Sequence, residues 1–539
     1  MTGFDYVVVG AGSAGCVVAN RLSESGRHRV LLLEAGGSDD RFFVRMPIGY
    51  GKCFFDPAVN WMYRTEPEAS LNGRSGYWPR GKLLGGSSAI NAMVFVRGQP
   101  QDFDAWEAMG NPGWGWRDVL PYFRKLEDSS RGECEWRATG GPLHVSDIAA
   151  DAHPLCEAFL RGGEQAGLLR NADFNGASQE GVGHYEITVR EGRRESTAAA
   201  YLRPARQRPN LAVYTNAHVL RVGFEGRRAA SVTFVREGER HTVHAAREVI
   251  VCAGAINTPL LLQLSGVGPA PLLQSLGIGV VHDSAAVGEH LQDHLCIDHL
   301  YGARVPTLNQ VLRPWHGKLA AGIRYVVARR GPLALSVNQA GGFVRSRAGL
   351  DRPNLQLYFS PLSYTRAPTG KRALMSPDPF PGFLLSAQPC RPRSRGRVLL
   401  RSADPFATPR IEPRSLQATE DLDELVEGAR FLRMLAATPA LAAIIDAELL
   451  PGPCVQTHDQ MIEDIRARCS SVFHPVGTCR MGPDANGAVV DSRLRAHGLA
   501  GLRIVDASVF PALTSGNTNA PVIMLAERAC DLILQDAAA

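Results

Sequence analysis

The sequence has no long apolar run and no cluster of basic residues. Its 539 residues carry a formal net charge of +5, with Lys and Arg dispersed along the chain. Nucleic-acid-binding proteins usually gather their basic residues on one face, so we expect no nucleic-acid partner. A helix that spans a bilayer needs about 20 apolar residues, and no stretch approaches that length. We therefore expect a protein that is soluble or at most attached to a membrane surface.

Paired cysteine motifs are also missing. The 11 cysteines are spread from Cys16 to Cys530, and none lies in a Cys-x-x-Cys motif. This spacing fits neither a zinc site nor a disulfide framework, so no metal is predicted. Reduced, mostly buried thiols are typical of the cytoplasm, and the strand pattern that begins at Phe4 leaves no room for a signal peptide. We expect a cytoplasmic location, with peripheral attachment to the inner membrane as the alternative.

Length and composition indicate a folded protein with two substantial units. A single hydrophobic core stops growing at roughly 250–300 residues, and this chain is much longer. Apolar residues make up 45% of the chain and charged residues 21%. That balance is ordinary for a globular protein, so disorder of the whole chain is excluded.

The N-terminal residues predict a strand, a glycine turn, a helix and a second strand. Residues 4–9 are apolar and rich in Val, as in a buried strand. Residues 10–15 read Gly-Ala-Gly-Ser-Ala-Gly, and residues 16–22 continue with a helical pattern. A second apolar run, residues 30–33, ends in Glu34. This order of elements is typical of a dinucleotide-binding unit.

Each glycine of the turn has a separate task in such a unit. Gly10 permits the tight turn, Gly12 lets the backbone approach a pyrophosphate, and Gly15 lets the helix pack against the strand. The helix N-terminus then offers N–H groups to the phosphates. Glu34 lies where a carboxylate accepts from ribose hydroxyls. The fingerprint alone does not separate NAD from FAD.

Three further regions narrow the choice of cofactor. They are residues 81–91 (Gly-Lys-Leu-Leu-Gly-Gly-Ser-Ser-Ala-Ile-Asn), residues 254–259 (Gly-Ala-Ile-Asn-Thr-Pro) continuing to Ser-Gly-Val-Gly at 265–268, and the C-terminal pair 474–482 (His-Pro-Val-Gly-Thr-Cys-Arg-Met-Gly) and 516–521 (Gly-Asn-Thr-Asn-Ala-Pro). With the N-terminal fingerprint, they resemble the glucose–methanol–choline (GMC) family of FAD oxidoreductases over nearly the whole chain. Within that family the chain is most similar to bacterial alcohol dehydrogenases and choline dehydrogenase-like flavoproteins.

The resemblance implies the GMC fold, an α/β FAD-binding Rossmann-like domain interleaved with an α+β substrate-binding domain. The FAD-binding domain would be discontinuous and collect residues 1–155, 205–300 and 465–539. The substrate-binding domain would collect residues 156–204 and 301–464.

The resemblance also implies two catalytic residues. His474 matches the family's catalytic histidine, and an imidazole with an ordinary pKa of about 6.5 can accept a proton near neutral pH. Asn517 occupies a position where family members carry either a second His or an Asn. An amide takes no proton, but its N–H can bind the alcohol oxygen. We therefore expect His474 to be the base and Asn517 to hold the oxygen.

The remaining positions that match the family's FAD contacts extend over the whole chain. They are Gly10, Gly12, Ser13, Ala14, Gly15, Glu34, Ala35, Gly85, Gly86, Ser87, Asn91, Ala92, Met93, Val94, Val219, Ala253, Asp506, Ala507, Thr518 and Asn519. Some family members link FAD covalently through a His just before the Asn of the Gly-Gly-Ser-Ser loop. That position is Ile90 here, and an alkyl side chain cannot form the bond, so we expect FAD to be bound non-covalently.

The function implied by the resemblance is FAD-dependent oxidation of a primary alcohol to an aldehyde, with electrons passed to a quinone-type acceptor. An alcohol oxidase that uses molecular oxygen shares every motif and stays an alternative. A hydroxynitrile lyase, which retains FAD without a redox change, is a second alternative. A non-catalytic FAD-binding protein conflicts with the presence of His474 and Asn517. The exact alcohol, the acceptor and the oligomeric state are not predicted.

Hydrophobic periodicity predicts further elements. Residues 211–253 alternate like strands, and residues 419–447 and 521–534 have helical spacing. Residues 311–333 predict one helix whose apolar residues fall on one face among basic residues, with Pro314 near its start. Such a helix can lie on an anionic membrane. The favoured interpretation is that its apolar stripe packs into the substrate domain.

Overall fold

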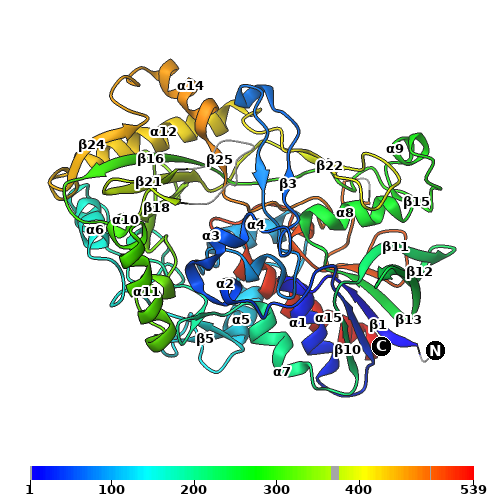
Figure 1. Ribbon diagram of the computed structural model, residues 1–539. Helices are drawn as coiled ribbons and strands as arrows, with labels where there is room; N and C mark the ends of the chain where they lie inside the picture. The colour runs from blue at the N-terminus through cyan, green and yellow to red at the C-terminus, as the bar shows by residue number, and fades with distance from the viewer. Residues whose placement is uncertain (1–2, 366–375, 486, 539) are drawn as a thin grey trace.

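The computed structural model describes residues 3–365, 376–485 and 487–538. Two large sheets lie side by side, one around β1 at the lower right of Figure 1 and one around β16 at its upper left. The chain crosses back and forth between them, so neither sheet is built from one continuous segment. The interleaved α/β and α+β architecture expected from the sequence is confirmed.

The first sheet contains the predicted dinucleotide-binding unit. Five strands run parallel in the order β10 (Leu211–Tyr214), β2 (Val30–Leu33), β1 (Phe4–Val9), β13 (Glu239–Val251) and β26 (Leu502–Ile504). All four residues of β2 are buried, as are the last four of β1. The near-continuous apolar sequence of these strands follows from burial on both faces.

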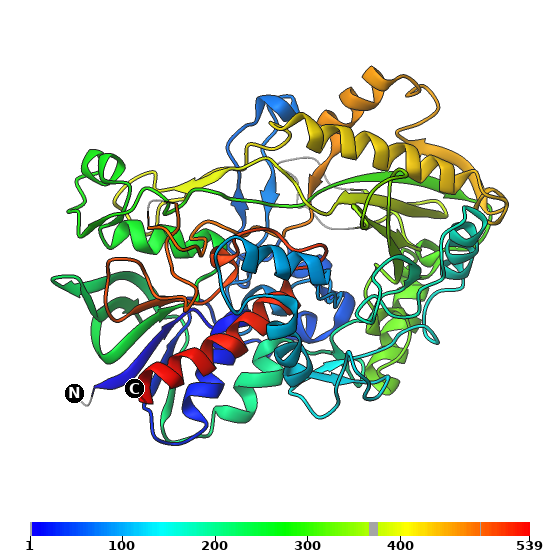
Figure 2. The ribbon, with the colours of Figure 1, turned by 180° about the vertical axis from the view of Figure 1, so that it is seen from behind.

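The helix and strands predicted around this sheet are confirmed. Helix α1 (Ser13–Ser23) connects β1 to β2. The first half of β13 extends beyond the parallel strands and pairs antiparallel with β12 (Arg228–Arg236), which pairs with β11 (His218–Glu225). The C-terminal helix α15 (Asn519–Ala538) is longer than the predicted 521–534 and runs diagonally across the rear of the molecule in Figure 2.

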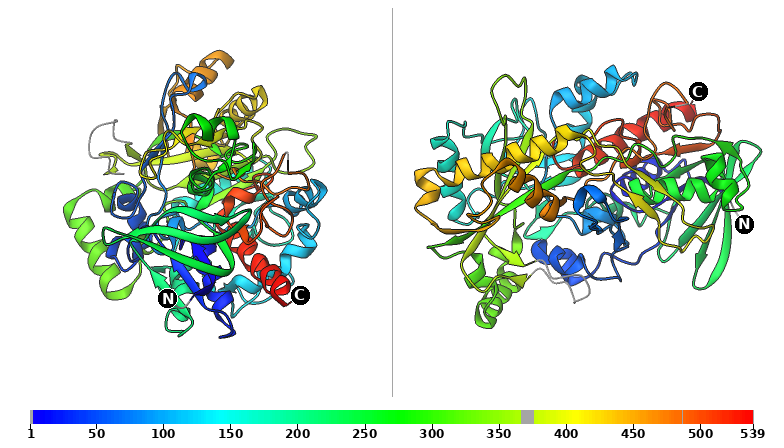
Figure 3. Two further views of the ribbon diagram at one scale, coloured as in Figure 1. Left: turned by 90° about the vertical axis from the view of Figure 1, so that its right-hand side faces the viewer. Right: turned by 90° about the horizontal axis from the view of Figure 1, so that it is seen from above.

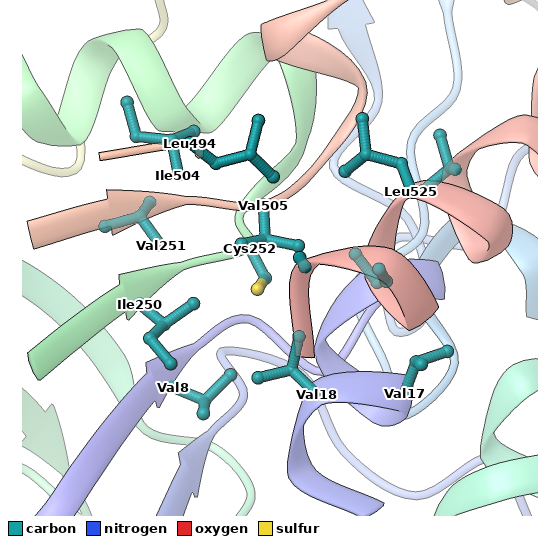
Figure 4. Packing of buried hydrophobic residues seen from close by; sticks show 14 of the residues in the cluster. Val8, Val17, Val18, Ile250, Val251, Cys252, Leu494, Ile504, Val505 and Leu525 are labelled. Atoms are coloured by element: carbon teal, nitrogen blue, oxygen red, sulfur yellow. The ribbon is translucent and has the colours of Figure 1, made fainter. Parts of the chain in front are cut away.

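The core of this half lies between the parallel strands and the two helices α1 and α15. Val8 and Ile250 from neighbouring strands, together with Val505, approach Val18 of α1 and Leu525 of α15 (Figure 4). All five side chains are fully buried. Burial of a large aliphatic side chain contributes about 1.5–3 kcal/mol, so this cluster fixes the strand ends that carry the glycine turn.

The second sheet is antiparallel and is covered on one face by helix α12 (Thr419–Ala436), which lies along the top of Figure 1. Its strands follow the order β24 (Ile445–Leu450), β16 (Leu295–Ala303), β21 (Gly382–Pro389), β18 (Leu355–Ser360), β17 (Ala340–Val344) and β7 (Gly181–His184), with β25 (Ser470–Ser471) also paired to β16. Other helices of eight or more residues in the described ranges are α4 (Pro100–Ala108), α5 (Trp116–Leu126), α6 (Leu155–Gln165), α8 (Gly254–Leu264), α11 (Trp315–Ala328) and α14 (His458–Arg468).

The helix predicted over residues 419–447 is wrong in its second half. Helix α12 ends at Ala436, and Thr438 is extended, with φ −64° and ψ 147°. The ring of Pro439 disfavours the helical conformation in the residue before it. A short helix, α13 (Pro439–Ala442), follows, and the chain then pairs with β16 as strand β24.

The single helix predicted over residues 311–333 is also wrong. Pro314 is extended and separates α10 (Leu308–Leu312) from α11 (Trp315–Ala328). The apolar stripe of α11 does not pack into the substrate domain, because Trp315 is 76% exposed and Val327 is 81% exposed. Only the opposite side of the helix is buried, and α11 protrudes at the edge of the molecule in both views of Figure 3. None of the helices in the described part of the chain is long and apolar enough to cross a bilayer.

Candidate active site

A cavity of about 1000 Å³ lies between the two sheets. On one side it is lined by residues that follow the carboxyl ends of the parallel strands, Gly10 after β1, Glu34 after β2 and Cys252 after β13. Ligands of open α/β sheets bind at this edge. The opposite wall comes from the antiparallel sheet. Every described residue predicted from the sequence as a catalytic or cofactor residue lines this cavity, except Gly15 and Gly85.

The glycine turn has the geometry that a close ligand requires. Gly10 has a φ of +97°, and a Cβ there would lie 2.6 Å from the carbonyl oxygen of Cys252. A Cβ on Gly15 would lie 1.8 Å from the carbonyl oxygen of Gly10, so Gly15 serves helix–strand packing. Gly12 precedes α1 without a capping side chain, which leaves the N–H groups of the first turn available to an anion.

Gly85 and Gly86 place a second loop against this turn. Gly85 has a φ of +88°, and its N–H donates to the carbonyl oxygen of Ala11 at 2.8 Å. A Cβ on Gly86 would lie 2.6 Å from the Cα of Gly12, so Gly86 must be glycine for the two loops to touch. Gly85 therefore acts by holding the loop in place, whereas Gly86 and Ser87 line the cavity.

Glu34 is fixed by the backbone of the turn. Its two carboxylate oxygens accept from the N–H groups of Ala11 and Gly36, each at 2.8 Å. Burial raises the pKa of Glu34 to about 7, while the two backbone donors oppose the shift. A carboxylate has about four lone-pair sites, so two of them remain for ribose hydroxyls.

The N-terminus of α15 meets the N-terminus of α1 at the cavity. Ser13 Oγ, in the first turn of α1, donates to Oδ1 of Asn519, the first residue of α15. Asp506 fixes the loop that follows β26, because its carboxylate accepts from the N–H of Gly254 at 2.8 Å and from Thr258 Oγ1 at 2.6 Å. Two helix N-termini beside a glycine cradle suit a pyrophosphate, so the residues present fit a dinucleotide such as FAD.

His474 and Asn517 meet at the other end of the cavity. Asn517 Nδ2 lies 3.2 Å from His474 Nε2. Burial lowers the pKa of His474 well below its ordinary value, and the neighbouring His294 and the cation Arg80 add to the shift. The imidazole is therefore neutral at pH 7 and able to accept a proton. The sequence predicted that these two residues share a site, and the structure brings them together.

The loop that carries His474 is held by residues the sequence interpretation missed. Asp293 Oδ1 accepts from the backbone N–H of His474 at 2.7 Å, and its other oxygen accepts from Ser471 Oγ. Arg80 donates to the carbonyl oxygen of Phe473 at 2.6 Å. Burial raises the pKa of Asp293 to about 6, against the opposing effects of Ser471 and Arg80. The sequence signal was the polar Gln-Asp-His run directly before a buried strand.

The wall contributed by the antiparallel sheet was also missed. Three neighbouring strands each present two residues at i and i+2, the spacing that puts side chains on one face of a sheet. They are Cys296 and Asp298 on β16, Tyr358 and Ser360 on β18, and Leu384 and Ser386 on β21. Strands buried on both faces show no alternation, so the sequence could not show which face lines a cavity.

Comparison with known proteins identifies the family. The N- and C-terminal family models described as GMC oxidoreductase match residues 4–296 and 392–526. The chain belongs to the GMC oxidoreductase family. This GMC oxidoreductase is therefore a flavoprotein that uses FAD and an enzyme that acts on CH–OH donors. In its described residues, no group of three or more His, Cys, Asp or Glu side chains is arranged to hold a metal ion.

Relatives of this GMC oxidoreductase cover almost its full length. It is 43% identical to "Alcohol dehydrogenase [acceptor]" of Pseudomonas putida, across 99% of this chain and 96% of that protein. It is 42% identical to "Oxygen-dependent choline dehydrogenase" of Vibrio vulnificus, across 98% and 94%. Among solved structures, pyridoxine 4-oxidase from "Mesorbium loti" has a TM-score of 0.88 at 32% identity, across 98% and 99%. Formate oxidase has a TM-score of 0.92 at 27% identity, across 99% and 98%.

Proposed function

We propose that this GMC oxidoreductase oxidises primary alcohols to aldehydes with His474 as the base, and that a quinone-type acceptor takes up the electrons. FAD, when bound, supplies the hydride acceptor. The observation that carries the proposal is the 3.2 Å approach of Asn517 Nδ2 to His474 Nε2 at the cavity end. A hydroxyl oxygen within hydrogen-bond distance of both nitrogens would meet one base and one donor.

The two side chains divide the work on the hydroxyl group. His474 Nε2 accepts the hydroxyl proton, which a neutral imidazole can do and a positioned base accelerates by about 10²–10⁴. Asn517 Nδ2 donates to the oxygen and holds it as negative charge develops. Burial keeps His474 neutral until it takes the proton.

The cofactor roles of the cavity residues are part of the proposal. The N–H groups at the start of α1 and α15 would bind the pyrophosphate, and Glu34 would bind the ribose. Asn91 and Met93, which line the cavity, would lie beside the flavin ring. We also propose two domains, a FAD-binding domain of residues 1–155, 205–300 and 465–539 and a substrate-binding domain of residues 156–204 and 301–464.

The cavity wall near His474 favours an apolar substrate tail. Val94, Cys296 and Tyr358 belong to one buried cluster against which Val472, two residues before His474, is packed. We therefore propose medium-chain primary alcohols as substrates. Asp298 lies on the same wall and offers a carboxylate to a cation such as choline, so choline is the informative competitor.

An anaerobic substrate series tests this function. Primary alcohols of increasing chain length, glucose and choline are added to the holoenzyme while flavin absorbance is followed. We expect bleaching, with the highest kcat/KM for medium-chain alcohols and no loss of that activity in Asp298→Asn. Highest efficiency with choline or a sugar would overturn the substrate class. A flavin that stays oxidised with every alcohol would favour a lyase. In a separate aerobic assay, rapid oxygen consumption would favour an oxidase.

We further propose that the enzyme works in the cytoplasm, weakly attached to an anionic membrane surface through α11. Trp315, Leu319, Ile323 and Val327 form the exposed apolar stripe of this helix. The sequence contains no acidic residue between Asp298 and Asp351, whereas five basic residues lie in or beside α11. These are Arg313, Lys318, Arg324, Arg329 and Arg330. An apolar face rimmed by basic residues binds at the headgroup region of anionic bilayers.

The opposite side of α11 connects this surface to the cavity. Ala321 belongs to the buried cluster that contains Tyr50, and Tyr50 lines the cavity. Phe42, which is 54% exposed on the neighbouring helix α2 (Phe42–Arg45), contacts Tyr325 of α11 with 6.3 Å between ring centroids. Attachment through α11 would therefore place the cavity close to lipid, which suits apolar alcohols and a membrane quinone.

Co-sedimentation with liposomes tests the attachment. We expect binding to anionic vesicles at low salt, weaker binding at high salt because surface charges are screened, and loss of binding in Ile323→Glu/Val327→Glu. Leu169→Glu, at another residue that is 72% exposed, is the matched control and should bind like the wild type. Equal binding by both variants, or none by the wild type, would remove this part of the proposal without touching the chemistry.

A further inference from the structure

The catalytic histidine lies on a short antiparallel ladder that brings a second buried histidine against its ring. Strand β16 pairs with β25, with Leu295 opposite Ser471. The pairing continues outside the strands, where Val472 N–H donates to the carbonyl oxygen of His294 at 3.1 Å. As a result, Nδ1 of His294 lies 3.0 Å from Nδ1 of His474.

A backbone carbonyl fixes the protons of this histidine pair. Nε2 of His294 lies 2.9 Å from the carbonyl oxygen of Cys390, which can only accept, so Nε2 carries the hydrogen. His294 is fully buried, and burial together with Arg391 lowers its pKa to about 4, so it is neutral at pH 7. Its Nδ1 is then a bare acceptor. His474 must donate from Nδ1, which leaves Nε2 of His474 as its basic nitrogen.

A second chain of hydrogen bonds fixes the orientation of the Asn517 amide. Tyr185 Oη donates to the carbonyl oxygen of Leu357 at 2.6 Å, so this hydroxyl must accept from Gln356 Nε2 at 3.2 Å. Gln356 Nε2 also donates to Asn517 Oδ1 at 3.2 Å. The amide of Asn517 is thereby turned with Nδ2 toward His474.

The orientation of Gln356 is fixed by its other neighbours. Its Oε1 accepts from Gln388 Nε2 at 3.2 Å, and Gln388 Oε1 accepts from Tyr358 Oη at 2.9 Å. Burial raises the pKa values of Tyr185 and Tyr358 far above the working range, so both stay protonated. The two hydrogen-bond chains start from different backbone carbonyls, those of Cys390 and Leu357. Both require that the unprotonated Nε2 of His474 faces Nδ2 of Asn517.

We infer that His294 is a positioning residue that holds His474 in the Nδ1–H tautomer, while Gln356 turns Asn517 so that its N–H faces the same point. This inference rests on the proposed alcohol oxidation and adds two residues, His294 and Gln356, that lie outside the short GMC motifs quoted from the sequence. It explains how a single base can face the hydroxyl with the correct nitrogen. A free neutral imidazole would divide its population between two tautomers, and only one of them leaves Nε2 able to accept.

A pair of isosteric variants separates this role from simple packing. In His294→Asn, the amide oxygen can occupy the place of Nδ1 and accept from His474. In His294→Leu, a side chain of the same branching has no acceptor. We expect the Leu variant to keep FAD and to lose between about 10-fold and about 10⁴-fold in kcat, the latter being the cost of a wrong histidine tautomer in a serine protease triad. The Asn variant should recover most of that loss.

The pH profile gives a readout that packing alone would not move. Charge repulsion from His294 also lowers the pKa of His474, and both variants remove that effect. An acceptor at Nδ1–H stabilises the imidazolium, and only His294→Asn keeps one. The acid limb of kcat/KM should therefore lie at lower pH in His294→Leu than in His294→Asn. Arg80, Asp293 and Arg391 are the charged groups near the pair, and they are unchanged in both variants.

A direct measurement of the His474 tautomer tests the inference and does not require catalytic turnover. In holoenzyme labelled with ¹⁵N-histidine, the His474 signals are assigned by their loss in His474→Gln. We expect a protonated Nδ1 and an unprotonated Nε2 in the wild type, and a mixed population in His294→Leu. A wild-type His474 protonated at Nε2, or equal kcat and pH profiles for the Leu and Asn variants, would overturn the inference. If no alcohol bleached the flavin, the proposed function would fail while this measurement still stood.

Discussion

Asn517 directs its Nδ2 at Nε2 of His474 across 3.2 Å, although 43 residues separate them in the sequence. One side chain comes from the loop after β25 and the other from the loop that leads into α15. The first loop is anchored on the antiparallel sheet, and the second leads into a helix packed on the parallel sheet. The reacting group of the substrate is therefore held where the two halves of the molecule meet.

Replacing His474 should remove most turnover and leave FAD in place. We expect His474→Ala to lose about 10²–10⁴ in kcat, the range for a positioned general base. Stopped-flow flavin reduction and the ratio of flavin to protein absorbance measure the two effects. His458→Ala, at an exposed histidine on α14, is the control. Near wild-type reduction at pH 7 would remove His474 from the base role.

Replacing Asn517 should cost less than replacing His474. One lost donor to a developing oxyanion costs at most about 2.7–4 kcal/mol in a well-organised site. Asn517→Asp keeps the shape but has no N–H, so we expect it to be impaired at least as much as Asn517→Ala. Both are compared by kcat/KM with one alcohol. If either lost more than His474→Ala, the two roles would have to be exchanged or shared.

The pH dependence should show a base that stays neutral well below pH 6.5. A histidine with a lowered pKa is in its accepting form above that pKa, so activity is present at neutral pH and is lost as the pH falls through the lowered value. Asp293, with its pKa raised to about 6, also titrates in this window. In Asp293→Asn an inflection near pH 6 should disappear and the limb of His474 should remain. A wild-type limb at or above pH 6.5 that persists in this variant would contradict the assignment.

FAD should be released by denaturation. Ile90 is buried beside the cavity, and its alkyl side chain offers no atom for a bond to the flavin. Acid precipitation should leave all yellow colour in the supernatant, at one FAD per chain. Flavin fluorescence that stays on the denatured band in a gel would show a covalent link through another residue.

The cofactor-binding half of the protein could be predicted from the amino-acid sequence. Residues 4–34 hold the strand, turn, helix and acid in one short segment. Gly15 has no substitute because its Cβ would lie 1.8 Å from the carbonyl oxygen of Gly10, and the φ of +97° at Gly10 favours glycine. These two constraints act between residues close in the chain, and they leave a glycine pattern that can be read directly. His474 and Asn517 could be named for a similar reason, since each lies in a short motif.

The environment of the catalytic pair and the exposure of α11 depend on how distant segments of the chain pack together. His294 reaches His474 through a ladder between segments 180 residues apart, and Gln356 reaches Asn517 across 161 residues. Nothing local in the sequence marks these contacts, because they depend on strand pairing. Helical periodicity likewise predicted an apolar face on α11 but not whether that face is buried or exposed. The buried side of the helix is the one with Ala321 and Tyr325. Periodicity determines which residues share a face, whereas packing against the rest of the chain determines which face meets water.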